Sequence, residues 1–512
     1  MIFILVYCSS IGISADRNIT RLLVGFKQPV DLNKILHKVT PLTTKSFYNE
    51  KLYCLDIHTN NLESIISQMT SDPMVAFVEI DRSWFITTEN NKGKAILEKQ
   101  AMPEWLDIIQ ADRLNELDLG RKVLVAILDT GIDLENRYFQ DHVSVNPLES
   151  VKDGIDNDAN GFIDDIYGWN FGDNTSTTQD ILGHGTHVTS ILLATFNHCK
   201  VLPIKINSGG NFEFKTSALV EALNYAMLMG AKVINMSLTL SEYSESVHFA
   251  IKTAYESGIV LVAAVGNNSN QIAYPAKLEE VIAVGSLYSA TELAYWFSPS
   301  GEEIDITAPG VKIDVIEIGG DAFYATGTSM SAPMVSGAIA ALLDMNPHLK
   351  PQTIRNLLSD SARDLGTPGE DDMFGAGALD CTQLQKIALP MLTLPTTPFY
   401  CYSKKIPIDI EYFLPRFDTD VYIYIGLKKD ELIWLLLPEG TWQLASEVQN
   451  GYVGFLQNYD QSTKGFLFGN QGIFPPLILS QWMTGNYLLG MAVVDAYGQY
   501  LAPISWSYVN IF

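Results

Sequence analysis

The chain has 512 residues, 47% of them hydrophobic and 18% charged, which is the composition of a globular protein and excludes a disordered one. A chain of this length is expected to form about two to four domains. Its formal net charge of −25 argues against nucleic acid as a partner, because phosphate binding needs a basic face.

At the N-terminus, residues 1–15 have features of a secretory signal peptide. An apolar run at 2–7 precedes two small residues, Ser14 and Ala15, that suit a cleavage point. The run is too short to span a membrane, and the basic segment that usually precedes it is missing. We expect a secreted or periplasmic protein without a transmembrane segment.

Residues 20–88 are typical of a small α+β domain. Strands are expected at 22–26, 52–57 and 74–80. One helix face between the last two strands is formed by Leu62, Ile65, Ile66 and Met69. The polar, turn-rich residues that follow indicate a linker over 89–102, in which the chain could be cut.

Residues 103–385 alternate between strand and helix. Apolar runs predict strands at 123–128, 233–238, 259–265 and 281–285. One helix stripe is formed by Leu219, Ala222, Leu223 and Ala226, and another by Val247, Ala250, Ile251 and Ala254. Such repeats predict an α/β fold in which a parallel sheet carries helices on both faces.

The first of these strands ends in Asp129, which is followed by Thr130 and Gly131. A carboxylate at the carboxyl end of a parallel strand lies where open α/β sheets place their sites. Taken alone, an aspartate before a glycine is more typical of a turn.

An acidic insertion at 153–165 interrupts the alternation. Its oxygen-bearing side chains alternate along the chain: Asp156, Asp158, Asn160 and, after Gly161, Asp164. This spacing is typical of a calcium loop. Tyr167 stands at the twelfth loop position, where an EF-hand has an acidic residue, so the segment is not an EF-hand. The alternative is an exposed acidic loop without an ion.

His184 lies between two glycines at the start of an apolar helix, which leaves its ring approachable. A neutral imidazole can accept a proton from a serine hydroxyl if a carboxylate holds its other nitrogen. His187 is expected to have a structural role. A metal site on these two histidines is discounted, because no glutamate stands between them as the zinc-protease motif requires.

The run at 259–265 leads into Gly266 and Asn267. The side-chain amide of Asn267 could donate to an oxyanion, and the alternative is an asparagine-rich turn.

A glycine turn at Gly327 leads into a further apolar helix. Pro333 fits only the first turn of a helix, so Ser329 is expected where this helix begins. Free N–H groups and the helix dipole favour negative charge there, which makes Ser329 a candidate nucleophile. An N-cap serine without chemistry is the alternative.

Residues 390–512 have a different character. Strand-like runs alternate with turn signals, and helix periodicity is absent. About seven short strands of this kind predict a C-terminal β-sandwich.

Four motifs, DTGID, HGTHVTS, VAAVGNN and GTSMSAPMVSG, occur in that order. Together they resemble the subtilisin-like serine proteases over roughly residues 103–383. The resemblance implies a subtilisin-like fold and a secreted serine endopeptidase that cuts protein or peptide substrates without an organic cofactor. It also implies a catalytic triad of Asp129, His184 and Ser329, with Asn267 as oxyanion donor.

The resemblance further implies a zymogen. Residues 20–88 are similar to the family's inhibitory propeptide, which covers the active site as an intramolecular inhibitor and is then cut away. Calcium loops with a sequence similar to that of residues 153–165 occur in many members of the family. We expect a monomer in which a structural calcium ion is held by Asp156, Asp158, Asn160 and Asp164.

The family also suggests a substrate cleft. The segment that pairs with extended substrate in the family corresponds here to Ser237, Leu238 and Thr239. Thr239 stands where the family usually has glycine, and we expect its side chain to change the shape of the cleft and to narrow it. The primary specificity pocket corresponds to Ala263, Ala264, Gly266 and Ala273. These small residues predict a preference for aromatic or long aliphatic side chains before the cut.

Two other functions stay open at this point. One is a catalytically weak binding or scaffold protein of the same fold that acts through its C-terminal module. The other is a non-proteolytic esterase or amidase.

Overall fold

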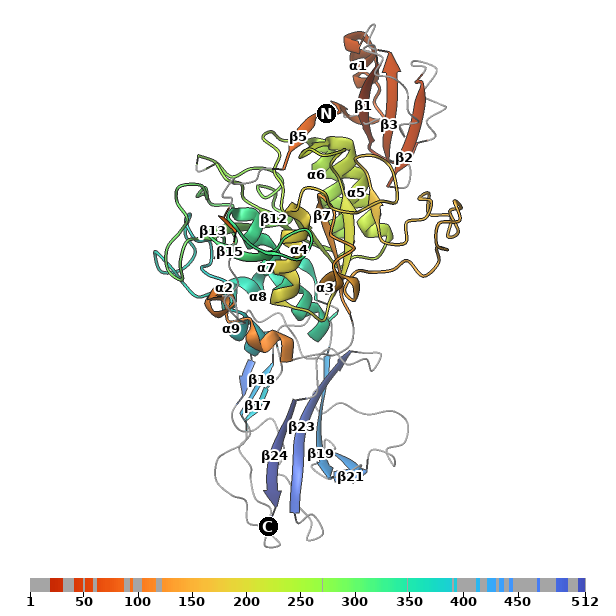
Figure 1. Ribbon diagram of the computed structural model, residues 1–512. Coiled ribbons are helices and arrows are strands. Elements are labelled where there is room, and N and C mark those ends of the chain that lie inside the picture. Colours follow the sequence, from red (N-terminus) through yellow and green to blue (C-terminus); the bar gives the residue numbers. More distant parts are fainter. Residues whose placement is uncertain are drawn as a thin grey trace. The chain divides into compact units, whose positions relative to one another are not determined.

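The computed structural model describes most of the chain up to residue 388 and the backbone of several later strands (Figure 1). The described ranges are 19–30, 41–48, 51–58, 62–86, 93–94, 104–116, 122–268, 270–347 and 349–388. The expected signal peptide at 1–15 and most of the linker at 89–102 lie outside them.

The chain divides into two compact units. The first comprises Met1–Glu116, Arg121–Ala341 and Ala362–Asp380, and the second comprises Leu117–Gly120, Leu342–Ser361 and Cys381–Phe512.

The described residues of 19–86 form an N-terminal module within the first unit. Its strands are β1 (Ile19–Phe26), β2 (Thr43–Phe47), β3 (Leu52–His58) and β4 (Val75–Ile80). They make an antiparallel sheet of order β2-β3-β1-β4, and α1 (Leu62–Thr70) packs against β4. We did not predict β2, because its sequence is mostly polar and only Phe47 is buried.

A seven-stranded parallel sheet forms the centre of the first unit, as predicted. Its order is β14-β13-β12-β11-β7-β9-β8. The strands are β7 (Leu124–Asp129), β8 (Trp169–Asn170), β9 (Lys200–Lys205), β11 (Val233–Met236), β12 (Val260–Ala264), β13 (Val281–Leu287) and β14 (Ile306–Pro309). Because all are parallel, their carboxyl ends meet at one edge.

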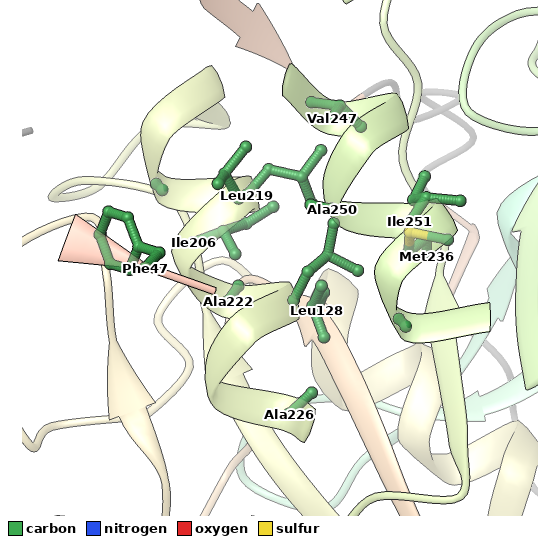
Figure 2. Packing of buried hydrophobic residues seen from close by; sticks show 14 of the residues in the cluster. Phe47, Leu128, Ile206, Leu219, Ala222, Ala226, Met236, Val247, Ala250 and Ile251 are labelled. Carbon is green, nitrogen blue, oxygen red and sulfur yellow. The ribbon is translucent and has the colours of Figure 1, made fainter. Parts of the chain in front are cut away.

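Helices cover both faces of this sheet. The four main ones are α4 (His184–Thr195), α5 (Thr216–Leu228), α6 (Glu245–Glu256) and α7 (Thr328–Met345). Apolar residues of α5 and α6 form one cluster with alternate strand residues such as Leu128 and Met236 (Figure 2). The intervening strand residues are buried too, which accounts for their continuous apolar runs. Phe47 of the N-terminal module lies beside α5 in the same cluster.

Shorter elements complete the first unit. They are β5 (Ser83–Phe85), β6 (Gly93–Lys94), α2 (Glu104–Ile109), η3 (Asp112–Glu116), α3 (Arg137–Gln140), β10 (Glu213–Lys215), β15 (Ile313–Ile316) and β16 (Ala322–Ala325). Among the helices that the structure describes, none combines the length and apolarity needed to cross a bilayer.

The position of Pro333 in α7 differs from our prediction. The helix begins at Thr328, so Pro333 lies in its second turn and not in its first. A proline there leaves the carbonyl of Ser329 without its usual helical donor. The hydroxyl of Ser237 donates to that carbonyl instead, at 2.9 Å. A neighbouring segment therefore compensates for the proline, which the local sequence does not reveal.

The described residues of the second unit form two further helices and two antiparallel sheets. The helices are α8 (Pro351–Ser361) and α9 (Cys381–Ala388). One sheet, of order β17-β18-β22, comprises β17 (Met391–Thr393), β18 (Glu411–Leu414) and β22 (Leu467–Gly469). The other, of order β21-β20-β19-β23-β24, comprises β21 (Trp442–Leu444), β20 (Leu432–Leu436), β19 (Val421–Lys429), β23 (Gly485–Asp495) and β24 (Ser505–Ile511). A β-sandwich stays a prediction, and α8, expected in the catalytic domain, falls in this unit.

Candidate active site

Asp129 is the last residue of β7 and is fully buried. Its Oδ1 atom accepts hydrogen bonds from the backbone N–H of Thr130, at 2.7 Å, and from Nδ1 of His184, at 2.8 Å. An aspartate that accepts from Nδ1 fixes the imidazole ring and leaves Nε2 as the nitrogen that can exchange a proton.

The first turn of α4 reaches Asp129 because it carries glycine. A β-carbon at position 185 would lie 2.1 Å from the carbonyl oxygen of Gly131, so a larger residue would push the helix away. Asp180 holds the same turn, because its carboxylate accepts from the N–H groups of Leu182, Gly183 and Thr186. His184 is thereby placed by backbone contacts on both sides.

His184 is 4% exposed, and its protonation is governed by buried charges. Burial alone disfavours the imidazolium, but the charge and hydrogen bond of Asp129 and the charge of Asp180 together raise the pKa of His184 above its ordinary value of 6.5. The Nε2 atom is buried and makes no hydrogen bond among the described residues, so the hydroxyl of Ser329 is not bonded to it here.

The side chains of Ser329 and Asn267 both lie close to Gly327. A β-carbon at position 327, where φ is +144°, would lie 3.0 Å from Nδ2 of Asn267 and 3.2 Å from Oγ of Ser329. Glycine therefore keeps open the space between the amide and the hydroxyl. That space is where an oxyanion formed at Ser329 would be within reach of Asn267.

The amide of Asn267 is held in one orientation. Its Oδ1 atom accepts from the N–H of Thr328, at 2.9 Å, and from the hydroxyl of Thr328, at 3.0 Å. The same hydroxyl accepts from the N–H of Gly266, at 3.1 Å. Because Oδ1 is used in this way, Nδ2 remains the donor on the Ser329 side. Sequence reasoning missed the role of Thr328, although it precedes the serine directly.

The structure thus gives two pairs, Asp129 with His184 and Asn267 with Ser329. Asp129 ends β7, and Asn267 follows the end of β12. Both pairs therefore stand at the carboxyl edge of the same sheet, as the strand pattern predicted.

The residues expected to bind substrate fall into two groups. Leu238 and Ala263 belong to the hydrophobic core, and Ala264 is buried as well. Thr239 and Ala273 flank Gly266, because a β-carbon on that glycine would lie 3.4 Å from a methyl carbon of each.

Ser237 uses its hydroxyl within the protein. Besides donating to the carbonyl of Ser329, it accepts from the side-chain amide of Asn235 at 3.0 Å. We expected this residue in the substrate cleft, and these contacts give it a part in holding the first turn of α7.

The acidic insertion brings together a set of carboxylates different from the predicted one. Oxygen atoms of Glu149, Asp158 and Asp165 lie within 4.8 Å of one another and could hold a metal ion. Asp156 and Asp164 instead accept hydrogen bonds from backbone N–H groups of the loop. Of the four residues predicted as ligands, Asp158 alone belongs to this group in the part of the chain that the structure describes.

Amides and a phenol satisfy the buried side of this group. Asn160 donates from its amide to Asp158 and Asp165, at 3.1 and 3.0 Å, and Asn146 donates to the same two carboxylates, each at 3.0 Å. Tyr225 donates to Asp165 at 2.6 Å. Asn160 was predicted as an oxygen ligand, and in the structure its Nδ2 atom faces the carboxylates.

Comparison with known proteins places these features in a family. The sequence model of the Subtilase family matches residues 120–377. Subtilisin DY of Bacillus licheniformis is 34% identical over 297 residues, which cover 55% of this chain and 97% of that protein. Subtilisin J of Geobacillus stearothermophilus is 30% identical over 368 residues, covering 67% and 85%. Minor extracellular protease Epr of Bacillus subtilis (strain 168) is 27% identical over 337 residues, covering 62% and 47%.

The charges around His184 make its titration a direct test of the site. We expect an NMR titration to give His184 a pKa above 6.5, and Asp129→Asn to lower it, because the main stabilising charge is removed. His142, whose pKa is lowered by burial and by Lys200, is an internal control that the substitution should leave unchanged. A pKa of His184 at or below 6.5 in the parent would contradict the described electrostatics.

Proposed function

The chain belongs to the subtilase family and is a serine endopeptidase, and on this basis we propose that Asp129, His184 and Ser329 form its catalytic triad. The hydroxyl of Ser329 attacks the carbonyl carbon of a peptide bond, and Nε2 of His184 takes the hydroxyl proton. Asp129 fixes the ring and stabilises the imidazolium. The proton then passes to the leaving amine, and water hydrolyses the acyl-enzyme by the same route.

Asn267 and the N–H of Ser329 hold the oxyanion in this proposal. The developing charge lies at the N-terminus of α7, where the helix dipole is favourable. The amide of Asn267 needs no reorientation, because Thr328 already holds its oxygen.

The single observation that carries the proposal is the buried hydrogen bond between Nδ1 of His184 and Asp129, with Nε2 left unpaired. The bond to Asp129 orients the imidazole ring, so Nε2 is the nitrogen left to accept the proton of the Ser329 hydroxyl.

A covalent serine-hydrolase probe tests this assignment. We expect the full chain, after maturation, to be labelled and to cut denatured protein. Ser329→Ala should abolish labelling and lower cleavage by at least about three orders of magnitude, because the nucleophile is gone.

Ser336→Ala is the matched control, because Ser336 lies in the same helix and its hydroxyl contacts only Asn235 among the described residues. Unchanged labelling of Ser329→Ala would refute the triad. Labelling of the parent without cleavage of protein would favour an esterase or amidase, and no labelling at all would favour the scaffold alternative.

We further propose that the N-terminal module is a propeptide that folds with, and covers, the catalytic region. The module supplies carboxylates to the N-termini of both helices it contacts. Asp81 accepts from the N–H and hydroxyl of Ser217 in α5, at 2.9 and 2.8 Å. The N-cap of α5 is Lys215, which offers no side-chain cap, so this contact fulfils a need of the helix.

Glu79 acts in the same way on α6. Its Oε2 atom accepts from the N–H and hydroxyl of Ser246, at 3.1 and 2.6 Å, and from the hydroxyl of Ser244, at 3.1 Å. A third contact is an ion pair between Lys45 of β2 and Glu221, which is buried in α5.

The end of the module binds the rest of the first unit as an added strand. Strand β5 pairs antiparallel with β10, so that Trp84 lies opposite Phe214, and the N–H of Ile86 donates to the carbonyl of Phe212 at 3.0 Å. The indole of Trp84 is buried and donates to Thr216 at 2.8 Å. An extended segment that adds a strand and buries an anchor side chain binds as a peptide substrate would.

Proton linkage predicts how the module separates. Burial raises the pKa of Glu79 and Asp81, the two carboxyls of the module that contact the N-termini of α6 and α5. Carboxyls whose pKa rises on assembly take up protons on assembly, so the association should weaken as the pH rises through these values. We expect a Ser329→Ala chain, cut by a foreign protease at a site inserted in the 89–92 linker, to retain the module at least about tenfold more tightly at pH 5 than at pH 8.

Glu79→Gln should reduce this pH dependence, since the glutamine does not titrate. Glu292→Gln, which changes an exposed carboxylate outside the contacts with the module, should leave it unaltered. Retention measured by size exclusion that is equal at both pH values would contradict the linkage.

We propose that Glu149, Asp158 and Asp165 hold a structural calcium ion. Asp165 is fully buried, and the close approach of three carboxylates is unfavourable without a cation. The amides of Asn146 and Asn160 can turn their oxygens toward an ion at this position, which suits the oxygen preference of calcium. The ion would tie the insertion to α5 through Tyr225 and would take no part in the chemistry.

Calcium should therefore raise the melting temperature of the Ser329→Ala chain, and chelation should lower it, by an amount that follows the free ion concentration. Asp158→Asn should remove most of this response, because a central ligand loses its charge. Glu135→Gln, at an exposed site outside the group, is the control. A calcium response that survives Asp158→Asn would rule out this group.

Secretion is also part of the proposal. It is supported by the apolar run at 2–7 and by the similarity to a protease named as extracellular. Protein substrates follow from the family.

A further inference from the structure

Lys205 is a buried lysine directly beside the candidate active site. It is the last residue of β9 and is 3% exposed. Its ammonium group donates to two neutral oxygens, the carbonyl of Thr130 at 2.6 Å and Oδ1 of Asn207 at 3.0 Å. Burying a charge on neutral partners costs folding free energy, so a compensating benefit is expected.

The sheet places Lys205 next to the proposed triad. Strands β7 and β9 are neighbours, and their register pairs Asp129 with Lys205. Residues in register on neighbouring strands point to the same face. The carbonyl that Lys205 holds belongs to Thr130, whose N–H donates to Asp129 and whose hydroxyl accepts from the N–H of Gly185 in α4.

The charges around this lysine are negative. The carboxylates that face it come from two segments, Asp129 from the end of β7 and Asp173 and Asp180 from the chain before α4. Asp129 and Asp180 also face His184, and both are almost completely buried. Two buried carboxylates that act on one imidazole would favour its protonated form and so disable it as a base.

We propose that Lys205 is a positioning residue of this active site: its buried ammonium fixes the Thr130 turn beneath the Asp129–His184 pair and supplies the positive charge that balances Asp129 and Asp180. The inference rests on the proposed triad. Lys205 does not touch the reacting atoms, and it acts through Asp129 and His184. Burial lowers the pKa of Lys205, and the charges of Asp180, Asp173 and Asp129 oppose this shift.

The test compares pH profiles of kcat/KM for the matured full chain and three variants. The acid limb of such a profile is the pH range in which activity rises as His184 loses its proton. In Lys205→Met this limb should move to higher pH by about half a unit to one unit, because removal of a nearby positive charge favours the imidazolium. Activity at neutral pH should then fall about tenfold, from the shifted limb and the loosened turn. Lys205→Arg keeps the charge and should restore the position of the limb even if its maximum stays lower.

Lys200→Met is the matched control. Lys200 begins the same strand and donates to the carbonyl of Asp141, and the substitution changes net charge equally. Five residues of strand separate it from Lys205 by about 16 Å, which exceeds the screening length in physiological salt. Its acid limb should coincide with that of the parent.

A purely structural lysine would lower stability and the maximum rate without moving the limb, and that result would overturn the inference. An equal shift in Lys205→Arg or Lys200→Met would also overturn it. If Lys205→Met does not fold, Lys205→Gln removes the charge and keeps a donor for the carbonyl of Thr130, and an unmoved limb in that variant again contradicts the inference. Absence of activity and of probe labelling in the parent would instead count against the proposed triad.

Discussion

The close approach between the first turn of α4 and the turn after β7 is the constraint on which the site depends. Gly185 lies against Gly131 with no room for a β-carbon, and this contact brings His184 within hydrogen-bond distance of Asp129. The parallel sheet brings the other residues close, because the ends of β7 and β12 share one edge and Asn267 lies three residues beyond the end of β12. A helix displaced by one side chain would leave the carboxylate, the imidazole and the amide as unrelated polar groups.

The central sheet could be predicted, and the candidate site residues could be singled out, because their signals are local. Asp129 ends an apolar run, His184 has glycine on both sides, and Ser329 follows a glycine turn. The apolar runs and helix stripes are likewise contained within single segments, so the parallel sheet with its covering helices could be predicted from them.

The structural features that could not be predicted from the sequence depend on contacts between distant segments. Pro333 was expected in the first turn of α7 and lies in the second. The fold tolerates it there because the hydroxyl of Ser237, from a distant segment, donates to the carbonyl of Ser329. Glu149 was missed because it precedes the repeat of alternating acids and reaches them only through the fold of the loop. The register between β7 and β9, which sets Lys205 beside Asp129, has no counterpart in local pattern.

The pairing of β5 with β10 would have a consequence for a protein from which the N-terminal module had been removed, as the proposed role of that module requires. Strand β10 is bonded on the side facing β5 along its whole length, from Glu213 to Lys215. Loss of the partner uncovers a row of backbone donors and acceptors, and such an edge pairs readily with any extended chain. A locally unfolded loop of a second copy of the enzyme would pair with this edge as well as a segment of a foreign protein would. The rate of autolysis in a concentrated sample would then depend on the rigidity of the enzyme's own surface loops. Self-digestion would begin at a loop that unfolds locally and becomes extended.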